Sequence, residues 1–425
     1  MTGVQTCALP TIARLEMGGG LGHIEDTPLV AYVASIIVSL KYSCRVLKGL
    51  EDVLKEAIDL YEGSDVQQIT QKMETAGTPQ SLKEFFIAAR KLEDIDPTIK
   101  IVEILAAPEE TYKKLQHRLG SKFREIRAKK YKDSLFEKGD SVGVTMWDSM
   151  NNPQSIAWLL SAPTSSVFQM AGRQFLTALR IRFRMDLPGL GNGVRCDCKV
   201  NGIHPLIDST GNHLSIKCKF LNGTNISTHN GVVQDVMVMC RCAGVFASTH
   251  FPPPFQCVIS ETSIESTKKI GDIMIYNGAA RHHMLDARLH NPVNAHVERG
   301  GYREVGDGAR AGEMEKERKF RELCDSVGID FTPVVIETFG RWGTRFEQFF
   351  KQTISAMADN KKIDASFAKN YWEKRISMSV QKGLADSINA KIYRFSAGRI
   401  GRRDESAHNA LMIGQSESFG SSGAG

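Results

Sequence analysis

Four potential soft metal ligands lie in the segment CDCKVNGIHPLIDSTGNHLSIKC. Cys196 and Cys198 are separated by one residue, His213 follows after fourteen more, and Cys218 after another four. Three thiolates and one imidazole are typical donors of a closed tetrahedral zinc site. The C-x-C spacing is tighter than the usual C-x2-C knuckle, and His204 is a competing ligand. The pattern predicts a structural Zn²⁺ site, and the alternative is a set of free core cysteines.

The metal would also be needed for folding, because this segment has too few apolar residues to fold alone. A second cysteine pair, Cys240 and Cys242, lies in a helical pattern with no histidine beside it. We interpret that pair as core.

Two carboxylates flank a predicted hairpin in the segment GDIMIYNGAARHHMLDARLHNP. Asp272 begins one apolar run and Asp286 lies near the end of the next, with thirteen residues between them. The dipeptide Asn277–Gly278 favours a hairpin connection, which would place the two acids side by side. Two adjacent carboxylates plus a phosphate oxygen are sufficient ligands for Mg²⁺, which retains several waters. The spacing predicts a Mg²⁺ site, and the alternative is a pair of solvated acids at strand ends.

Further groups could complete such a site. Lys316 and Lys319 lie on a predicted helix after the hairpin, where either could orient or deprotonate an attacking water and offset phosphate charge. Glu261 precedes the first strand and is a possible third acid.

The segment Tyr112–Asp133 contains nine lysines and arginines against two acids. Clusters of this kind bind the phosphates of nucleic acids and release counterions. A solvated helix face is the alternative. The predicted phosphate contacts are Lys122, Arg124, Arg127, Lys129 and Lys130.

The elements that must position these residues alternate between helices and strands. Apolar residues recur with helical spacing over 28–135, and two more helices are expected in 152–187, separated by Ala162–Pro163–Thr164. Short strands follow at QCVIS, DIMIY and MLDARLH, then a Gly-rich loop over Arg299–Gly312. The last predicted elements are a helix over 313–327, a strand over 332–339, and helices over 345–357 and 365–393. This order indicates an α/β or α+β fold.

Composition narrows the class of protein. The chain has 425 residues, 42% of them hydrophobic and 24% charged, as in globular proteins of two or three domains. Nine unevenly spaced cysteines indicate a reducing compartment rather than a disulfide framework. The apolar run Leu29–Leu40 is closed by Lys41 and is too short to span a bilayer, so we expect a buried helix and no membrane partner.

The first twelve residues, MTGVQTCALPTI, resemble a translated sequencing-adapter remnant. We exclude them from the predicted fold and expect this chain to be a fragment of a protein that begins upstream.

Read in order, a series of motifs is more specific than any one of them: GGLG with an apolar helix, SIAWLLSAP, FLTALRIRF, the Cys–His cluster, THNGVVQDV, GDIMIY, LDARLHNP, EKERKF and VVIETFGRWG. This series resembles the region downstream of the polymerase in reverse transcriptases of non-LTR retrotransposons. The group concerned carries a restriction-like endonuclease after a zinc knuckle.

The resemblance implies a PD-(D/E)xK nuclease core, a mixed sheet flanked by helices. Asp272 and Asp286 match its two acids, and Lys316 or Lys319 matches a lysine moved onto a helix. His229 and Asn230 match the family's R-H-N motif, with Thr228 in place of Arg, and would contact the sheet or DNA. The alternative for these residues is a helix N-terminus capped by Asn or Thr. Departures from the family are Gly271 in place of proline and the short C-x-C spacing.

The implied activity is Mg²⁺-dependent nicking of target DNA, which exposes a 3′-hydroxyl for primed reverse transcription. The implied partners are the DNA target, the element's RNA and a missing upstream polymerase domain, and the implied site of action is the nucleus. No Tyr-x-Asp-Asp or Phe-x-Asp-Asp motif occurs, so the sequence does not predict polymerase activity. The alternatives are a non-catalytic zinc-knuckle module that binds nucleic acid, and a decayed remnant.

The predicted organisation begins with the unstructured segment 1–12 and a helical region over 13–140 that contains the basic helix 112–133. A helical pair and the zinc knuckle follow over 141–224, and then a restriction-like endonuclease core over 225–345. The chain is expected to end with helices over 346–396 and a disordered tail over 397–425.

Overall fold

The computed structural model divides into two compact units, Met1–Asp140 and Ser141–Gly425. The boundaries expected near 224 and 345 fall inside the second unit. Several predicted features lie outside the described residues: Glu261, Asn277–Gly278, the strand QCVIS and the segments 1–12 and 401–425. The structure describes residues 26–112, 114–190, 195, 196, 198, 204–215, 218, 222–249, 271–276, 281–293, 295–298, 300–302 and 304–400.

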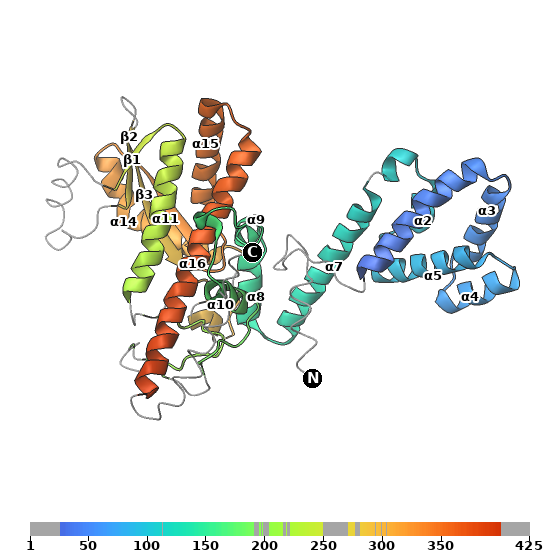
Figure 1. The fold of residues 1–425 in the computed structure, drawn as a ribbon, viewed down its shortest axis with the longest axis horizontal. Coiled ribbons are helices and arrows are strands. Elements are labelled where there is room, and N and C mark those ends of the chain that lie inside the picture. Colours follow the sequence, from blue (N-terminus) through green and yellow to red (C-terminus); the bar gives the residue numbers. More distant parts are fainter. Residues whose placement is uncertain are drawn as a thin grey trace, which may run out of the picture. The chain divides into compact units, whose positions relative to one another are not determined.

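The first unit is helical throughout its described part (Figure 1). Its core contains the fully buried Phe85 and Phe86 of one helix and Phe123 of another. Asp65 caps one helix through the backbone N–H of Gln68, which explains where that helix begins. The elements are α2 (Asp26–Val46), α3 (Leu50–Tyr61), α4 (Val66–Thr75), α5 (Gln80–Ile95), α6 (Ile101–Ala106), η1 (Glu109–Tyr112) and α7 (Leu115–Glu137).

Helix α2 is longer than the sequence pattern predicted. It continues past Lys41 to Val46, because lysine has a high helix propensity and a single lysine does not end a helix. Among the described residues, Leu29–Val46 is the one stretch long and apolar enough to cross a membrane, by length and composition. One face of it, including Val33 and Ile37, is fully buried in the core of the same unit.

The second unit contains a four-stranded sheet in the order β1-β2-β3-β4. The strands are β1 (Phe246–Ser248), β2 (Ile273–Tyr276), β3 (His283–His290) and β4 (Asp330–Glu337). The pairs β1–β2 and β2–β3 are antiparallel, whereas the pair β3–β4 is parallel. The pairing predicted between DIMIY and MLDARLH is confirmed, since β2 and β3 pair with Ile273 opposite Leu285.

The connection between the parallel strands contains α13 (Ala295–Glu298) and α14 (Asp307–Ser326). The predicted Gly-rich loop was wrong beyond residue 306, because α14 begins at Asp307. Its glycines allow close packing against β4 instead. A Cβ at Gly308 would lie 2.6 Å from Glu337 Oε1, and one at Gly312 would lie 2.9 Å from Val335 Cγ1.

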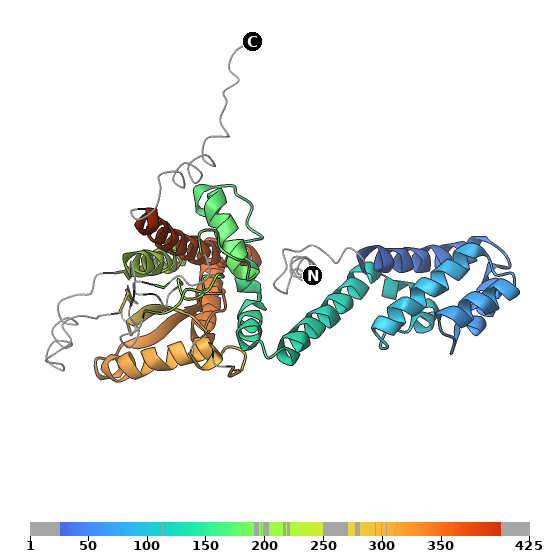
Figure 2. The ribbon, with the colours of Figure 1, turned by 90° about the horizontal axis from the view of Figure 1, so that it is seen from below.

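Helices cover both faces of the sheet (Figure 2). One face carries Ile275, Leu285 and Ile336, which pack against α11 (Asn222–Cys242), α15 (Thr344–Lys361) and α16 (Ala365–Ile400). The other carries Met274 and Met284, which pack with Phe320 of α14. The period-two alternation of these residues therefore fixes which side chains face α14. This unit is a mixed α/β fold, as the element order predicted.

The remaining described helices precede the sheet. They are α8 (Ser141–Met150), α9 (Pro153–Ile156), η2 (Ser166–Phe168) and α10 (Gly172–Arg182). The predicted pair over 152–187 is present as α9 and α10, although α9 forms only a single turn. At the other end, α16 continues to Ile400, so residues 397–400 belong to a helix and not to the disordered tail predicted for them.

Helices α11 and α16 approach closely where Gly383 faces Thr228. A Cβ at Gly383 would lie 2.4 Å from Thr228 Cγ2. Overpacking of this kind costs about 1–3 kcal/mol, against a gain of at most about 1 kcal/mol from replacing a helical glycine. We expect Gly383→Ala to lower the free energy of unfolding by on the order of 1 kcal/mol, measured by urea denaturation.

Gly231 of α11 is the matched control, since a Cβ there would meet nothing within 4 Å. Gly231→Ala should raise stability by up to about 1 kcal/mol. Equal effects of the two substitutions would contradict the close approach of the helices.

Candidate catalytic cavity and metal-binding cluster

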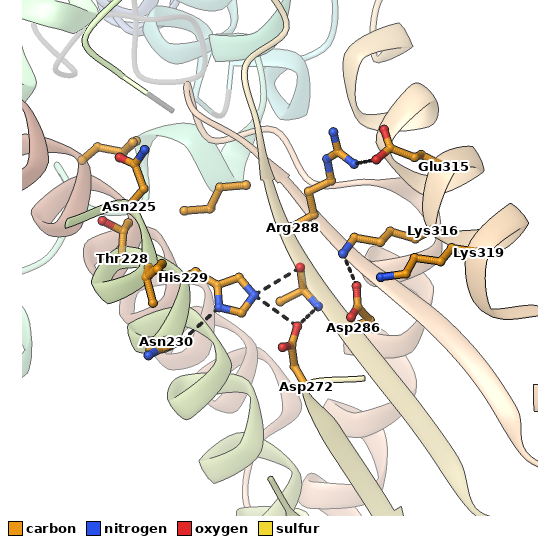
Figure 3. A pocket seen from close by; sticks show the side chains of 14 residues that line it. Asn225, Thr228, His229, Asn230, Asp272, Asp286, Arg288, Glu315, Lys316 and Lys319 are labelled. Atoms are coloured by element: carbon orange, nitrogen blue, oxygen red, sulfur yellow. Dashed lines mark hydrogen bonds and ion pairs between the residues drawn. The ribbon is translucent and has the colours of Figure 1, made fainter. Parts of the chain in front are cut away.

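The sheet places the two predicted acids next to each other. The β2–β3 register, extended by one residue, sets Asp272 opposite Asp286. The backbone N–H of Asp272 continues the ladder by donating to Leu285 O at 2.9 Å. Both carboxylates line a cavity of about 650 Å³, together with residues of α11 and α14 (Figure 3).

Asp286 is the more buried acid, with 4% of its surface exposed. It projects toward α14, and its Oδ2 forms an ion pair with Lys316 Nζ. Burial raises the pKa of Asp286, Lys316 opposes that rise, and the neighbouring Asp272 adds to it. The carboxylate is therefore costly to ionise unless a cation lies beside it.

Asp272 is held in its ionised form by hydrogen bonds. Its Oδ2 accepts from Ala287 N at 2.7 Å and lies 3.1 Å from His229 Nε2. Burial raises the pKa of Asp272, but the contacts with His229 and Ala287 outweigh burial and leave it below its usual value. The two acids are thus shifted in opposite directions, an arrangement common at functional sites.

His229 reaches the cavity from the other side of the sheet. Its Nε2 lies 3.3 Å from Ala287 O, and its Nδ1 lies 3.2 Å from Asn230 Oδ1. A capped helix N-terminus was an alternative interpretation of these residues, but α11 begins at Asn222, so His229 and Asn230 lie inside the helix. The preceding Thr228 is 3% exposed and packs on Gly383. This position has no room for the arginine expected from the R-H-N motif.

The contact between His229 and Asp272 predicts a pH-dependent effect on stability. Asp272 is the main cause of a raised pKa at His229. The stabilisation from the charged imidazole is fully present below its unfolded pKa of roughly 6.5, and is lost as pH rises through the higher folded value. We expect His229→Gln to cost more stability near pH 6 than near pH 9, by on the order of 1 kcal/mol, in urea denaturation without Mg²⁺.

His283 gives a control of opposite sign. Burial lowers the pKa of His283, whose Nε2 lies 2.8 Å from Thr332 Oγ1. The imidazole of His283 therefore resists protonation in the folded state. His283→Gln should cost more stability near pH 9 than near pH 6. The same trend in both variants would refute the assigned contacts.

The α14 side of the cavity is basic. Lys319 lines it together with Lys316, and Lys319 Nζ lies 4.5 Å from the centroid of the Phe320 ring. Arg288 of β3 also lines the cavity and forms an ion pair with Glu315. Sequence reasoning did not assign Glu315 to the site, although it directly precedes Lys316.

The predicted zinc ligands come together in the same unit. The donor atoms of Cys196, Cys198, His213 and Cys218 all lie within 4.8 Å of one another, and the group could hold a metal ion such as zinc. The Sγ atoms of Cys196 and Cys218 are 3.3 Å apart. His204 is not part of the group, because its Nδ1 lies 2.9 Å from the Cys196 carbonyl oxygen.

This cluster is the one group of three or more potential metal ligands within the described ranges. Within the described ranges, no third acid or histidine forms such a group of ligands with Asp272 and Asp286. Glu261, the predicted third acid, lies outside the described ranges. Cys240 is buried in the core with Cys242 packed against it, as the sequence predicted.

The predicted phosphate-binding residues lie on α7 of the first unit. Its apolar face, with Leu119 and Phe123, is buried in that unit's core. Of the five predicted residues, Arg124 Nη2 donates to Ser121 Oγ at 2.7 Å. Lys122, Lys129 and Lys130 are exposed, and Arg124 and Arg127 are half-buried.

The fold and these sites define a mixed α/β protein with a cavity lined by acidic and basic side chains and a separate Cys₃His cluster. No protein-family model matches the chain, and no curated protein matches it in sequence.

Proposed function

We propose that the second unit is a Mg²⁺-dependent DNA endonuclease with a restriction-like core. In a retroelement protein it would nick target DNA for primed reverse transcription. One observation carries the proposal: two carboxylates with opposite pKa shifts and a lysine line one cavity. The series of motifs in the sequence and the β3–α14–β4 arrangement also support a restriction-like endonuclease.

The residues fit a magnesium ion by their chemistry. Asp272 and Asp286 would hold it, and the ammonium of Lys316 already occupies a cationic position beside Asp286. A cavity of about 650 Å³ leaves room for waters and a phosphate. When bound, Mg²⁺ would neutralise phosphate charge and polarise the phosphorus centre.

The side chains of α14 and β3 would handle the substrate. Lys316, displaced from Asp286 by the metal, would face the scissile phosphate or the attacking water, and Lys319 and Arg288 would offset phosphate charge. Attack of water oxygen on phosphorus breaks the bond to O3′, and O3′ takes up a proton. The products are a 3′-hydroxyl, which a polymerase can extend, and a 5′-phosphate.

The other predicted groups would bind rather than cleave. Zn²⁺ would occupy the Cys₃His cluster, and the exposed lysines of α7 would contact DNA or the element's RNA. The upstream polymerase would be the protein partner, and the nucleus the place of action.

Nicking of a supercoiled plasmid tests the proposal. The full chain, zinc-loaded, should convert supercoiled DNA to the open circular form with Mg²⁺ but not with Ca²⁺ or without a divalent ion. The nick should be extendable by a DNA polymerase, since it carries a 3′-hydroxyl. A folded, zinc-loaded protein that never nicks would refute the proposal.

A second candidate is a zinc-knuckle module that binds nucleic acid without cleaving it. The pairing of both acids favours it, because Lys316 contacts Asp286 and His229 contacts Asp272. This candidate predicts salt-dependent binding that Asp286→Asn leaves unchanged or strengthens, and no Mg²⁺-dependent nick.

A further inference from the structure

Lys391 of α16 is a fully buried lysine, with 0% of its surface exposed. Its ammonium donates to three oxygens: Leu214 O at 2.9 Å, Ser215 O at 3.2 Å and Asn225 Oδ1 at 3.1 Å. Each N–H of the ammonium therefore has one acceptor. All three acceptors are neutral, so the hydrogen bonds satisfy the donors without balancing the charge.

A buried charge without a counter-charge is strongly destabilising. No carboxylate in the described part of the chain lies within ion-pair distance of Lys391. The groups whose charge favours the ammonium are the thiols of Cys196, Cys198 and Cys218, while burial lowers the pKa of Lys391. Among the described residues, the cysteine cluster is therefore the source of negative charge near Lys391.

The charge of a loaded cluster matches this requirement. Three thiolates and a neutral imidazole around Zn²⁺ carry a net charge of about −1, which is unfavourable in a buried site. We propose that Lys391 is the counter-ion of the metal-loaded Cys₃His cluster and the link that fastens it to α11. The inference rests on the proposed zinc occupancy, and it does not depend on nuclease activity.

The same ammonium connects the cluster to the cavity. Asn225, which accepts from Lys391, lines the cavity, and its Nδ2 donates to the Cys218 carbonyl at 3.2 Å. On the other side, Asn291 at the end of β3 donates to Ser215 Oγ at 2.8 Å. The metal-binding segment is thus tied to α11 and to β3, the elements that carry His229 and Asp286.

Zinc affinity measured by competition with a chromophoric chelator tests the inference. Lys391→Met and Lys391→Gln should each weaken zinc binding by about 10–100-fold, as loss of an outer-shell partner does. Lys382→Met is the matched control. Lys382 lies on the same helix and donates to Ser166 O and Val167 O, but the charges that favour it are Asp235 and Asp386. Its zinc affinity should equal that of the wild type.

The glutamine variant separates charge from hydrogen bonding, since glutamine can still donate. Wild-type affinity in Lys391→Gln, or in Lys391→Met, would overturn the inference. If Lys391→Met does not fold, the zinc affinity of Lys391→Gln remains the test of Lys391, and cobalt(II) substitution in the wild type tests the charge of the cluster. The cobalt-loaded wild type is expected to show the charge-transfer absorption of three thiolates. A spectrum typical of two thiolates would mean that the loaded cluster has no net charge for Lys391 to balance. A wild type that binds zinc but never nicks would refute the nuclease and leave this inference intact.

Discussion

Asp286→Asn is expected to abolish Mg²⁺-dependent nicking while the protein stays folded. The carboxylate is 4% exposed, and burial raises its pKa, so ionisation depends on the cation beside it. Asparagine keeps the shape but removes the charge that would hold Mg²⁺. Loss of several kcal/mol of transition-state stabilisation corresponds to a rate at least about 1,000-fold lower, measured as initial nicking rates at saturating Mg²⁺.

Asp330→Asn is the control for this prediction. Asp330 lies on the neighbouring strand β4, its side chain is 53% exposed, and it pairs with Arg281 away from the cavity. Its nicking rate should match the wild type. Retention of Mg²⁺-dependent nicking by Asp286→Asn would show that Asp286 does not hold the catalytic metal.

Lys316 makes the same experiment more informative, because its ion pair with Asp286 would compete with the proposed Mg²⁺. Lys316→Met should lower the Mg²⁺ concentration at half-maximal rate while it lowers the maximal rate. If the ion pair between Lys316 and Asp286 were purely structural, Lys316→Met would not lower both the Mg²⁺ concentration at half-maximal rate and the maximal rate.

The carboxylate pair was predictable because it depends on local rules. Alternation of apolar residues and an Asn-Gly turn signal predicted the hairpin, and its register places Asp272 opposite Asp286. The cysteine spacing was similarly informative, since ligand types restrict the metal. In both cases the residues that interact lie within about one supersecondary unit.

What the sequence did not show depends on contacts between distant segments. Nothing near Lys391 in the chain indicates that its ammonium contacts the carbonyls of Leu214 and Ser215. The contact between His229 and Asp272 joins a helix to a strand 43 residues later. The glycines of α14 led to the prediction of a loop. Glycine is favoured both where the backbone must be free and where elements pack closely, so its presence alone does not separate the two cases.

Removal of the metal from the Cys₃His cluster is expected to destabilise the second unit strongly. The cluster lies in a small core with Leu214 and Ile388, and the described residues between α10 and α11 form no helix or strand. Binding of a structural zinc is coupled to folding, and a loss of several kcal/mol would lower Tm by on the order of 10 °C. Differential scanning calorimetry of zinc-loaded and chelated protein measures this shift.

Cys218→Ser should have the Tm of the chelated wild type and no response to added zinc, because serine is a poor zinc ligand. Cys242→Ser is the matched control, since Cys242 is half-buried and belongs to no ligand group among the described residues. It should keep the full response to zinc. If the Tm of the wild type does not depend on zinc, the four residues are an ordinary buried cluster, and Lys391 then has no charge to balance.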